Sequence, residues 1–201
     1  MELNYVTNNA YKVFMTKQFM AKHNIAVNQI KLETPEIQDP DVSLVAKYSA
    51  QYAYDKVKKP VLKNDGGLYI PALNNFPAAF TKYAEDMLGE DGILALMQDK
   101  QDRTAYWLEA LAYADEDGVK VFLCKTTGKI AYEKSGQYGW GYDKIFIPDG
   151  QSVTLANFED SPRGLLWDRS GYDQLAKYIL SKNKQLEHWH TLNCVLIFLY
   201  N

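Results

Sequence analysis

The chain has little cysteine, no long apolar run and no excess of positive charge. Its 201 residues include only two cysteines, Cys124 and Cys194. We therefore expect neither a disulfide scaffold nor a cysteine-rich metal site, and a reducing compartment fits. The formal net charge of −3 argues against a nucleic-acid partner, which normally needs a basic face. The composition thus favours a small-molecule ligand over a polymer.

Segments that would direct the chain to a membrane are also missing. The N-terminus has no basic region followed by an apolar stretch, so we expect no signal peptide. The apolar run at 191–201 is shorter than the about 20 residues of a spanning helix. We predict that it forms a strand packed on the body or on a partner chain. A cytoplasmic protein without a membrane partner is the expectation.

Three residues of the same tail could be read as a metal site. His188, His190 and Cys194 are zinc-ligand types at short spacing. Such residues in a tail more often simply pack, and we favour that alternative.

Hydrophobic periodicity predicts a mixed α/β protein with a cleft between two lobes. With 47% apolar residues the chain can bury a sizeable core. Residues 1–184 are expected to form one domain, and 185–201 an apolar C-terminal extension. The acidic turn at 115–118 predicts a hairpin. Strands are expected at 3–7, 27–32, 61–64, 105–113, 119–124 and 129–136, and helices at 10–23, 41–57, 79–87, 90–97 and 171–181. An irregular stretch is expected between the strand 61–64 and about residue 78.

The most informative motif is an acid that an apolar strand delivers into two glycines. Asn64, Asp65, Gly66 and Gly67 follow the apolar residues 60–62. An acid placed there can hold a metal or a water, and glycines let the backbone approach a ligand. An ordinary turn has the same pattern and remains the alternative.

A second motif lies near the N-terminus, where a strand, a polar turn and a helix follow one another. Thr7, Asn8 and Asn9 are expected at the start of that helix, where free N–H groups attract anions. Lys12 adds a full charge one turn further on. The alternative is a simple helix cap beside a solvated lysine.

Two further segments complete a recognisable set. They are 33–38, with the sequence Glu-Thr-Pro-Glu-Ile-Gln, and 139–150, which begins Gly-Trp-Gly-Tyr-Asp. In this order the four motifs resemble those of the inosine triphosphate pyrophosphatases: Thr-Gly-Asn-x-x-Lys, Leu-Pro-Glu-Ile-Gln, Asp-Ser-Gly-Leu and Gly-Phe-Gly-Tyr-Asp-Pro-Ile-Phe. The resemblance spans about residues 3 to 180, and four ordered motifs are far more specific than one.

The resemblance implies a fold and an activity. The fold would be a mixed central sheet flanked by helices, with two lobes around a nucleotide-binding cleft. The reaction would be hydrolysis of a purine nucleoside triphosphate to the monophosphate and pyrophosphate, with Mg²⁺ or Mn²⁺ as cofactor and a homodimer as the assembly.

The resemblance also implies roles that these residue types can fill. Glu36 and Asp65 would be the metal ligands, since Mg²⁺ prefers carboxylates with phosphate oxygens and waters. Asp65 would also orient or deprotonate the attacking water, and Lys12 would neutralise the polyphosphate. Trp140 would stack on the purine, with core packing as the alternative. The substrate-binding residues would be Thr7, Asn8, Asn9, Lys12, Gly66, Trp140, Tyr142, Asp143, Arg163, Asp168 and Arg169.

Several positions depart from the family patterns. Asn64 stands where most members have a second acid, Ser49 where they have lysine, Gly66 where they have serine, and Lys144 where they have proline. The protein could therefore be a nucleotide-binding sensor or partner-binding protein with weak or no turnover, and this is the alternative function.

Nearby lysines could compensate for the lysine lost at position 49. Lys47, Lys63 and Lys82 are the candidates, with ordinary surface lysines as the alternative.

The segment expected to recognise the base diverges most. Arg163 keeps a cation and Arg169 keeps the family position, but Asp168 replaces histidine, a possible donor, with an acceptor. We predict altered base selectivity, with Arg169 donating to a 6-oxo group and Asp168 accepting from N1–H and a 2-amino group. An adenine reading through the 6-amino group stays open, as does a simple pairing of Asp168 with Arg163 or Arg169.

Overall fold

A central sheet of seven strands organises the molecule. The computed structural model describes the backbone of residues 1–199 and the side chains of residues 1–184. The strand order is β2-β1-β3-β5-β6-β7, and β4 pairs with β3. The strands are β1 (Glu2–Val6), β2 (Ala26–Ile30), β3 (Val61–Tyr69), β4 (Pro77–Ala78), β5 (Thr104–Asp115), β6 (Gly118–Ile130) and β7 (Phe146–Pro148).

Pairing in this sheet is mixed, as predicted. β1 lies parallel to β2 and to β3, and the remaining pairs are antiparallel. β5 and β6 form the expected hairpin, closed at Asp115 and Gly118. The mixed α/β fold is therefore confirmed.

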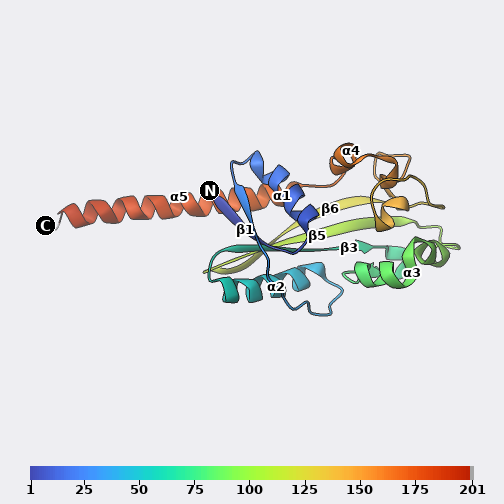
Figure 1. The fold of residues 1–201 in the computed structure, drawn as a ribbon, viewed down its shortest axis with the longest axis horizontal. Helices are drawn as coiled ribbons and strands as arrows, with labels where there is room; N and C mark the ends of the chain where they lie inside the picture. The colour runs from blue at the N-terminus through green and yellow to red at the C-terminus, as the bar shows by residue number, and fades with distance from the viewer. Residues whose placement is uncertain (200–201) are drawn as a thin grey trace.

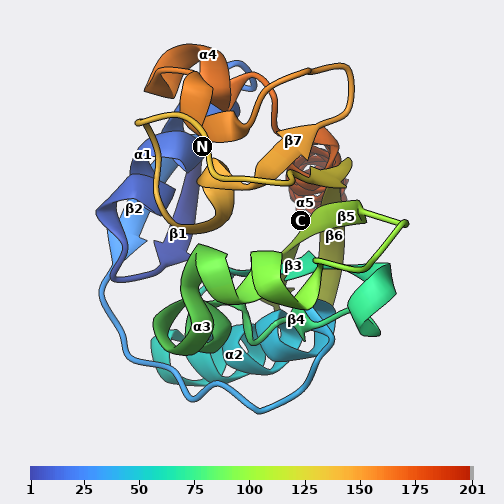
Figure 2. The same ribbon diagram turned by 90° about the vertical axis from the view of Figure 1, so that its right-hand side faces the viewer.

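Helices cover both faces of the sheet (Figures 1 and 2). α2 packs on β3 and β5, where it buries small residues such as Ala46 and Ala50. α1 and the first part of α5 lie together on the opposite face. The helices are α1 (Ala10–Ala21), α2 (Val42–Val57), α3 (Thr81–Leu96), α4 (Asp160–Gly164) and α5 (Ser170–Leu199), with short 3₁₀ turns η1 (Pro71–Leu73), η2 (Gly141–Lys144) and η3 (Leu155–Asn157).

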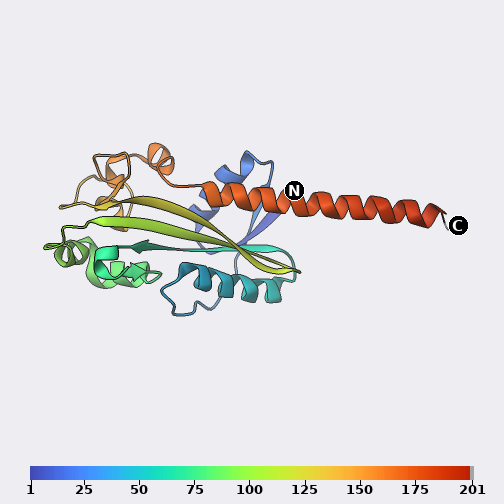
Figure 3. The same cartoon turned by 180° about the vertical axis from the view of Figure 1, so that it is seen from behind.

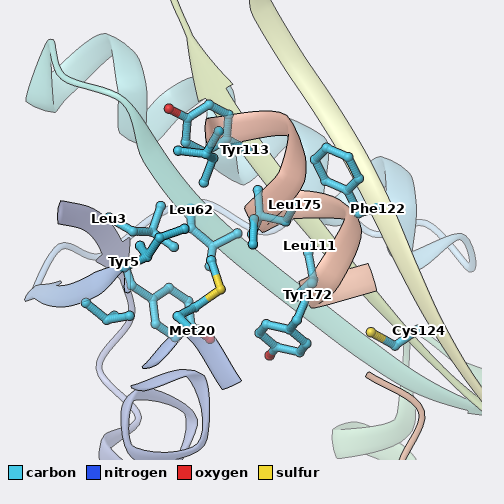
Figure 4. Packing of buried hydrophobic residues seen from close by; sticks show 14 of the residues in the cluster. Leu3, Tyr5, Met20, Leu62, Leu111, Tyr113, Phe122, Cys124, Tyr172 and Leu175 are labelled. Carbon is cyan, nitrogen blue, oxygen red and sulfur yellow. The ribbon is translucent and has the colours of Figure 1, made fainter. Parts of the chain in front are cut away.

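The largest apolar cluster lies between the sheet and the pair α1 and α5. Leu62 and Leu111 face Leu175 across this layer, and Tyr5 and Tyr172 lie at its edge (Figure 4). The two tyrosines are almost fully buried. Because their hydroxyl groups need partners, the edge of this cluster also positions polar side chains of the site.

Two strand boundaries expected from the sequence are wrong. β3 does not end at residue 64 but runs through both glycines to Tyr69, because its backbone pairs continuously with β5. The strand expected at 129–136 is not present as a separate strand, since β6 ends at Ile130 and an irregular segment follows.

The two helices expected at 79–87 and 90–97 correspond to the two halves of α3. Gly89, with φ 61°, is non-helical and divides them.

The prediction of a strand at 191–201 is wrong for the described residues. α5 continues as a helix to Leu199 and leaves the body of the molecule (Figure 3). The side chains of His188, His190 and Cys194 lie outside the described residues, as do residues 200 and 201. None of the helices in the described part of the chain has the length and apolar character needed to cross a membrane.

Candidate functional site

Two adjoining cavities bring the predicted site residues together. Asn9, Lys12 and Asn64 line both cavities and form the junction between them. The polar cavity is lined by Thr7, Asn8, Asn9, Lys12, Leu32, Glu33, Thr34, Glu36, Lys63, Asn64 and Asp65. The aromatic cavity has Tyr11, Phe19, Trp107, Trp140, Trp167 and Tyr172 in its wall, together with Gly66, Glu109, Asp143, Arg163, Asp168 and Arg169.

Asp65 lies in the polar cavity with an enclosed, unpartnered carboxylate oxygen. Its Oδ2 accepts no hydrogen bond within the described chain. Burial raises the pKa of this carboxyl to about 6, although the nearby Lys12 and Lys63 charges oppose the rise. Glu36 is exposed on the same cavity. An orphaned carboxylate oxygen beside a second carboxylate suits a divalent cation that also takes phosphate oxygens and waters.

The part of the chain with described side chains, residues 1–184, contains no ready-made cluster of three or more metal ligands. Among the described residues, no group of at least three His, Cys, Asp or Glu side chains converges. Two carboxylates are nevertheless enough for Mg²⁺, which keeps several waters and is usually completed by substrate phosphates. The donor set therefore fits Mg²⁺ and not a closed zinc site.

Lys63, one of the candidate replacement cations, lines the polar cavity. It precedes the acid on β3 and is not an ordinary surface lysine. Burial and the nearby Lys12 charge lower the pKa of its ammonium group. By contrast, Lys47 is exposed, and Lys82 pairs with Asp86 at the surface. Lys63 is thus the candidate that compensates for the missing cation.

The turn before α1 is both a helix cap and part of the polar cavity wall. The side-chain oxygen of Asn9 accepts hydrogen bonds from the N–H groups of Tyr11 and Lys12, at 2.9 and 3.1 Å. Thr7 in turn accepts from the N–H of Asn9 at 3.1 Å. The cap is therefore confirmed, but Thr7, Asn8, Asn9 and Lys12 also line the polar cavity. Capping fixes where Lys12 projects.

Asn64 lines both cavities, but both polar atoms of its side chain are already hydrogen-bonded to protein groups. Its Oδ1 accepts from the hydroxyl of Tyr5 at 2.6 Å, and its Nδ2 donates to Oε1 of Glu109 at 2.6 Å. Tyr172 donates to the same Glu109 oxygen at 2.9 Å. The motifs do not include Glu109; the available signal is that it is the single acid within the otherwise apolar run 105–114.

Trp140 and its neighbours form one wall of the aromatic cavity. Trp140 is 59% exposed, so core packing is excluded for it and its indole is free to stack. Tyr142 is 1% exposed and belongs to a core cluster, which corrects its expected place on the cavity wall. Asp143 accepts from the N–H of Trp140 at 3.3 Å. Burial raises the pKa of Asp143 to about 6, against that hydrogen bond and the charge of Arg163.

Arg163 and Arg169 line the same cavity but are held differently. Arg163 is buried, lies 3.6 Å from Asp143 and pairs with Asp160. The guanidinium of Arg169 lies 4.1 Å from the ring centroid of Phe19, and its Nε has no hydrogen-bond partner within the described chain. The Nη2 group donates to the carbonyl of Gly164 at 3.4 Å, and the guanidinium lines the aromatic cavity, so its remaining Nη N–H groups can serve a ligand.

Asp168 pairs with neither arginine. Its oxygens accept from the N–H of Lys125 at 2.7 Å and from the N–H and hydroxyl of Ser170, both at 2.9 Å. Partial burial opposes ionisation, but these hydrogen bonds outweigh it and lower the pKa of Asp168. Asp168 thus ties the start of α5 to β6, a role that the sequence did not suggest.

Ser49 stabilises the loop that carries Glu36. It is buried on α2, and its hydroxyl donates to the carbonyl of Pro35 at 3.0 Å. We predict that Ser49→Ala lowers the apparent affinity for Mg²⁺ by about 3- to 10-fold, the effect of one lost hydrogen bond, with kcat changed little. Titration of activity with Mg²⁺ measures this, with Ser43→Ala on the same helix as the control. Equal Mg²⁺ dependence in both variants would contradict the role.

The two glycines of β3 differ in how closely the neighbouring backbone packs against them. A Cβ on Gly67 would lie 2.2 Å from the carbonyl oxygen of Ala78, whereas on Gly66 its nearest neighbour, the Leu108 oxygen, would be 3.6 Å away. We predict that Gly67→Ala destabilises the fold by about 1–3 kcal/mol, because the clash is with backbone, and that Gly66→Ala costs much less. Urea unfolding of the two variants compares them directly. Equal losses would refute the distinction.

Comparison with known proteins identifies the family of this chain. The Ham1 family model matches residues 3–164, which include every part of the polar cavity. The chain belongs to the Ham1 family. Its resemblance to the pyrophosphatases named above is thereby confirmed.

Individual relatives of this Ham1-family chain cover most of its length. The dITP/XTP pyrophosphatase of Methanopyrus kandleri is 36% identical over 157 residues, 78% of this chain and 84% of the relative. That of Pyrobaculum aerophilum is 33% identical over 184 residues, 91% and 98% of the two chains. The Ham1 protein of Staphylococcus aureus has a similar fold, with TM-score 0.77, 24% identity and coverage of 91% and 100%.

Proposed function

We propose that this protein hydrolyses purine nucleoside triphosphates of the ITP, XTP or GTP type, in ribo or deoxyribo form, to the monophosphate and pyrophosphate. One observation carries the proposal: a polar cavity lined by two lysines and three carboxylates opens into an aromatic cavity through Asn9, Lys12 and Asn64. A purine nucleoside triphosphate joins the same two chemistries in one molecule, because its triphosphate is highly charged and its base is flat and aromatic. The relatives named dITP/XTP pyrophosphatase support the assignment.

In this proposal the polar cavity holds the triphosphate. Lys12 and Lys63 neutralise its oxygens and the charge that develops during transfer, which is where most of the catalysis of phosphoryl chemistry arises. Asp65, whose pKa is about 6, is ionised near neutral pH and can orient or deprotonate the attacking water. Mg²⁺, or Mn²⁺, held by Asp65 and Glu36 would supply further charge neutralisation.

The aromatic cavity then holds the base. Trp140 offers its exposed face for stacking, and the guanidinium of Arg169 in the cavity wall offers N–H groups for a 6-oxo group. Arg163, fixed between Asp143 and Asp160, supports this wall.

The test is pyrophosphate release from ITP, XTP, GTP, dGTP, ATP, dATP and pyrimidine triphosphates with Mg²⁺. We expect release from purines with a 6-oxo group and none from Asp65→Asn. Repeating the assay with EDTA and then with Mn²⁺ tests the cofactor. Absence of release from every triphosphate would overturn the proposed reaction.

One observation favours a second candidate, a nucleotide-binding sensor or partner-binding protein with weak turnover. Asn64 gives its oxygen to Tyr5 and its N–H to Glu109, so position 64 adds no charge beside Asp65. Calorimetric binding of nucleotide without pyrophosphate release would support this candidate.

We also propose a cytoplasmic homodimer that interacts with neither nucleic acid nor membrane. The family resemblance supports the dimer. Light scattering of the full chain and of a chain ending at residue 184 would measure its mass and the contribution of the C-terminal extension.

A further inference from the structure

Glu109 brings to the aromatic cavity a carboxylate oxygen, Oε2, that accepts no hydrogen bond within the described part of the chain. Glu109 projects from β5 into this cavity, with its side chain 27% exposed. Its Oε1 accepts from Asn64 and Tyr172, whereas Oε2 has only Arg169 nearby, with Nη1 at 3.9 Å. A partly buried carboxylate held by one oxygen keeps the other for a ligand.

Asp168 does not offer the same capacity. Both of its oxygens already accept hydrogen bonds, from Lys125 and Ser170. The sequence predicts Asp168 as the acceptor for the base, but Glu109 has the carboxylate oxygen that is open to a ligand.

Glu109 also lies apart from the carboxylates of the polar cavity. In the register of β3 and β5 it pairs with Gly66, while Asp65 pairs with Ala110. Because neighbouring residues of a strand point to opposite faces, Glu109 and Asp65 project from opposite sides of the sheet. Glu109 lines only the aromatic cavity and does not join Glu36 and Asp65.

Arg169 and Glu109 together present a donor beside an acceptor. Both side chains line the aromatic cavity, and Nη1 of Arg169 lies 3.9 Å from Oε2 of Glu109. A 6-oxopurine presents the complementary pair, since its O6 accepts and the adjacent N1–H donates. A carboxylate can accept from N1–H and from a 2-amino group, but it faces a 2-oxo group as one acceptor faces another.

We propose that Glu109 is the specificity residue of this site and that it selects 6-oxopurines with a 2-amino group or no 2-substituent, the guanine and hypoxanthine types, against xanthine. The proposal rests on the proposed function, because it assumes that the aromatic cavity binds the base. With this base preference, the chain would differ from relatives named dITP/XTP pyrophosphatase.

The decisive experiment compares GTP, ITP and XTP as substrates of the wild type, Glu109→Gln and Glu133→Gln. Glu133 is exposed and outside both cavities, so its variant is a matched control. The wild type should show kcat/KM about 10- to 100-fold higher for GTP than for XTP, the range expected for hydrogen bonds to a charged group. Glu109→Gln should reduce this ratio at least tenfold, because the amide can donate to a 2-oxo group, and Glu133→Gln should leave it unchanged.

A binding measurement separates this inference from the proposed reaction. Quenching of tryptophan fluorescence by GMP and XMP reports base selection without turnover, since Trp107, Trp140 and Trp167 line the cavity. If no triphosphate is hydrolysed but GMP binds more tightly than XMP in the wild type and not in Glu109→Gln, the reaction fails and the inference holds. If triphosphates are hydrolysed with the same GTP to XTP ratio in both proteins, the inference is overturned and the reaction stands.

A second variant distinguishes base selection from structural support. Tyr172→Phe removes one hydrogen bond to Oε1 but leaves Oε2 in the cavity. It should lower the melting temperature yet keep the preference of GMP over XMP. An equal loss of preference in Tyr172→Phe and Glu109→Gln would show that the network, and not the carboxylate, determines selection, and would overturn the proposal.

Discussion

Asp65→Asn is expected to reduce kcat for pyrophosphate release by about 10³-fold while leaving the fold intact. The change removes the charge of the one enclosed, unpartnered carboxylate of the polar cavity and keeps its volume. Charge stabilisation at a metal-assisted site is worth several kcal/mol, and each 1.36 kcal/mol corresponds to a factor of ten in rate. Steady-state assays on purine triphosphates at saturating Mg²⁺ measure the loss.

The same substitution should stabilise the metal-free protein above pH 6. The folded-state pKa of Asp65, about 6, is above its ordinary value of 3.8. Ionisation of this buried carboxylate therefore opposes folding, by at most about 3 kcal/mol. The penalty is fully present above pH 6, decreases as the pH falls and is absent below about pH 4. Melting curves in EDTA at pH 8 and pH 4 should show a higher melting temperature for Asp65→Asn only at pH 8.

Asp99→Asn provides the control for both effects. Asp99 is exposed and lies in neither cavity. It should leave kcat and the pH dependence of melting as in the wild type. Normal turnover by Asp65→Asn, or a lower melting temperature at pH 8, would remove Asp65 from the assigned role.

The fold could be predicted where a segment determines its own conformation. Strands near 3–7 and 105–113 and the helix at 41–57 follow from periodicity and turn residues. β3 could not be delimited, because pairing with β5 carries it through Gly66 and Gly67 against their low strand propensity. The helix at the C-terminus was misread as a strand, since short apolar runs do not distinguish the two.

The site could be predicted where an ordered motif carried it. Lys12, Asp65 and Trp140 were expected from such motifs, and each lines a cavity. Lys63 and Glu109 belong to strands in which neighbouring side chains alternate between the two faces, so their place depends on the register of β3 and β5. Register is a property of the folded sheet, and no single segment encodes it.

Lys12→Met is expected to lower kcat/KM by about 10²- to 10³-fold, through both a higher KM and a lower kcat. Lys12 lies at the junction of the two cavities, where under the proposed function it would face the triphosphate before and during transfer. A preorganised charge of this kind is worth about 2.7–4 kcal/mol in other enzymes. Methionine retains most of the side-chain length without the charge. Lys17→Met, on the exposed side of the same helix, is the control and should leave the kinetics unchanged.

The pH dependence of the Lys12 variant tests the geometry beyond the loss of rate. The Lys12 charge lowers the pKa of Asp65 against the larger effect of burial, which raises it. Without that charge the pKa of Asp65 rises, so the acid limb of kcat/KM should move to higher pH in Lys12→Met and stay in place in Lys17→Met. A slower enzyme with an unshifted acid limb would mean that Lys12 acts on substrate alone. The coupling of Lys12 to Asp65 across the polar cavity would then be wrong.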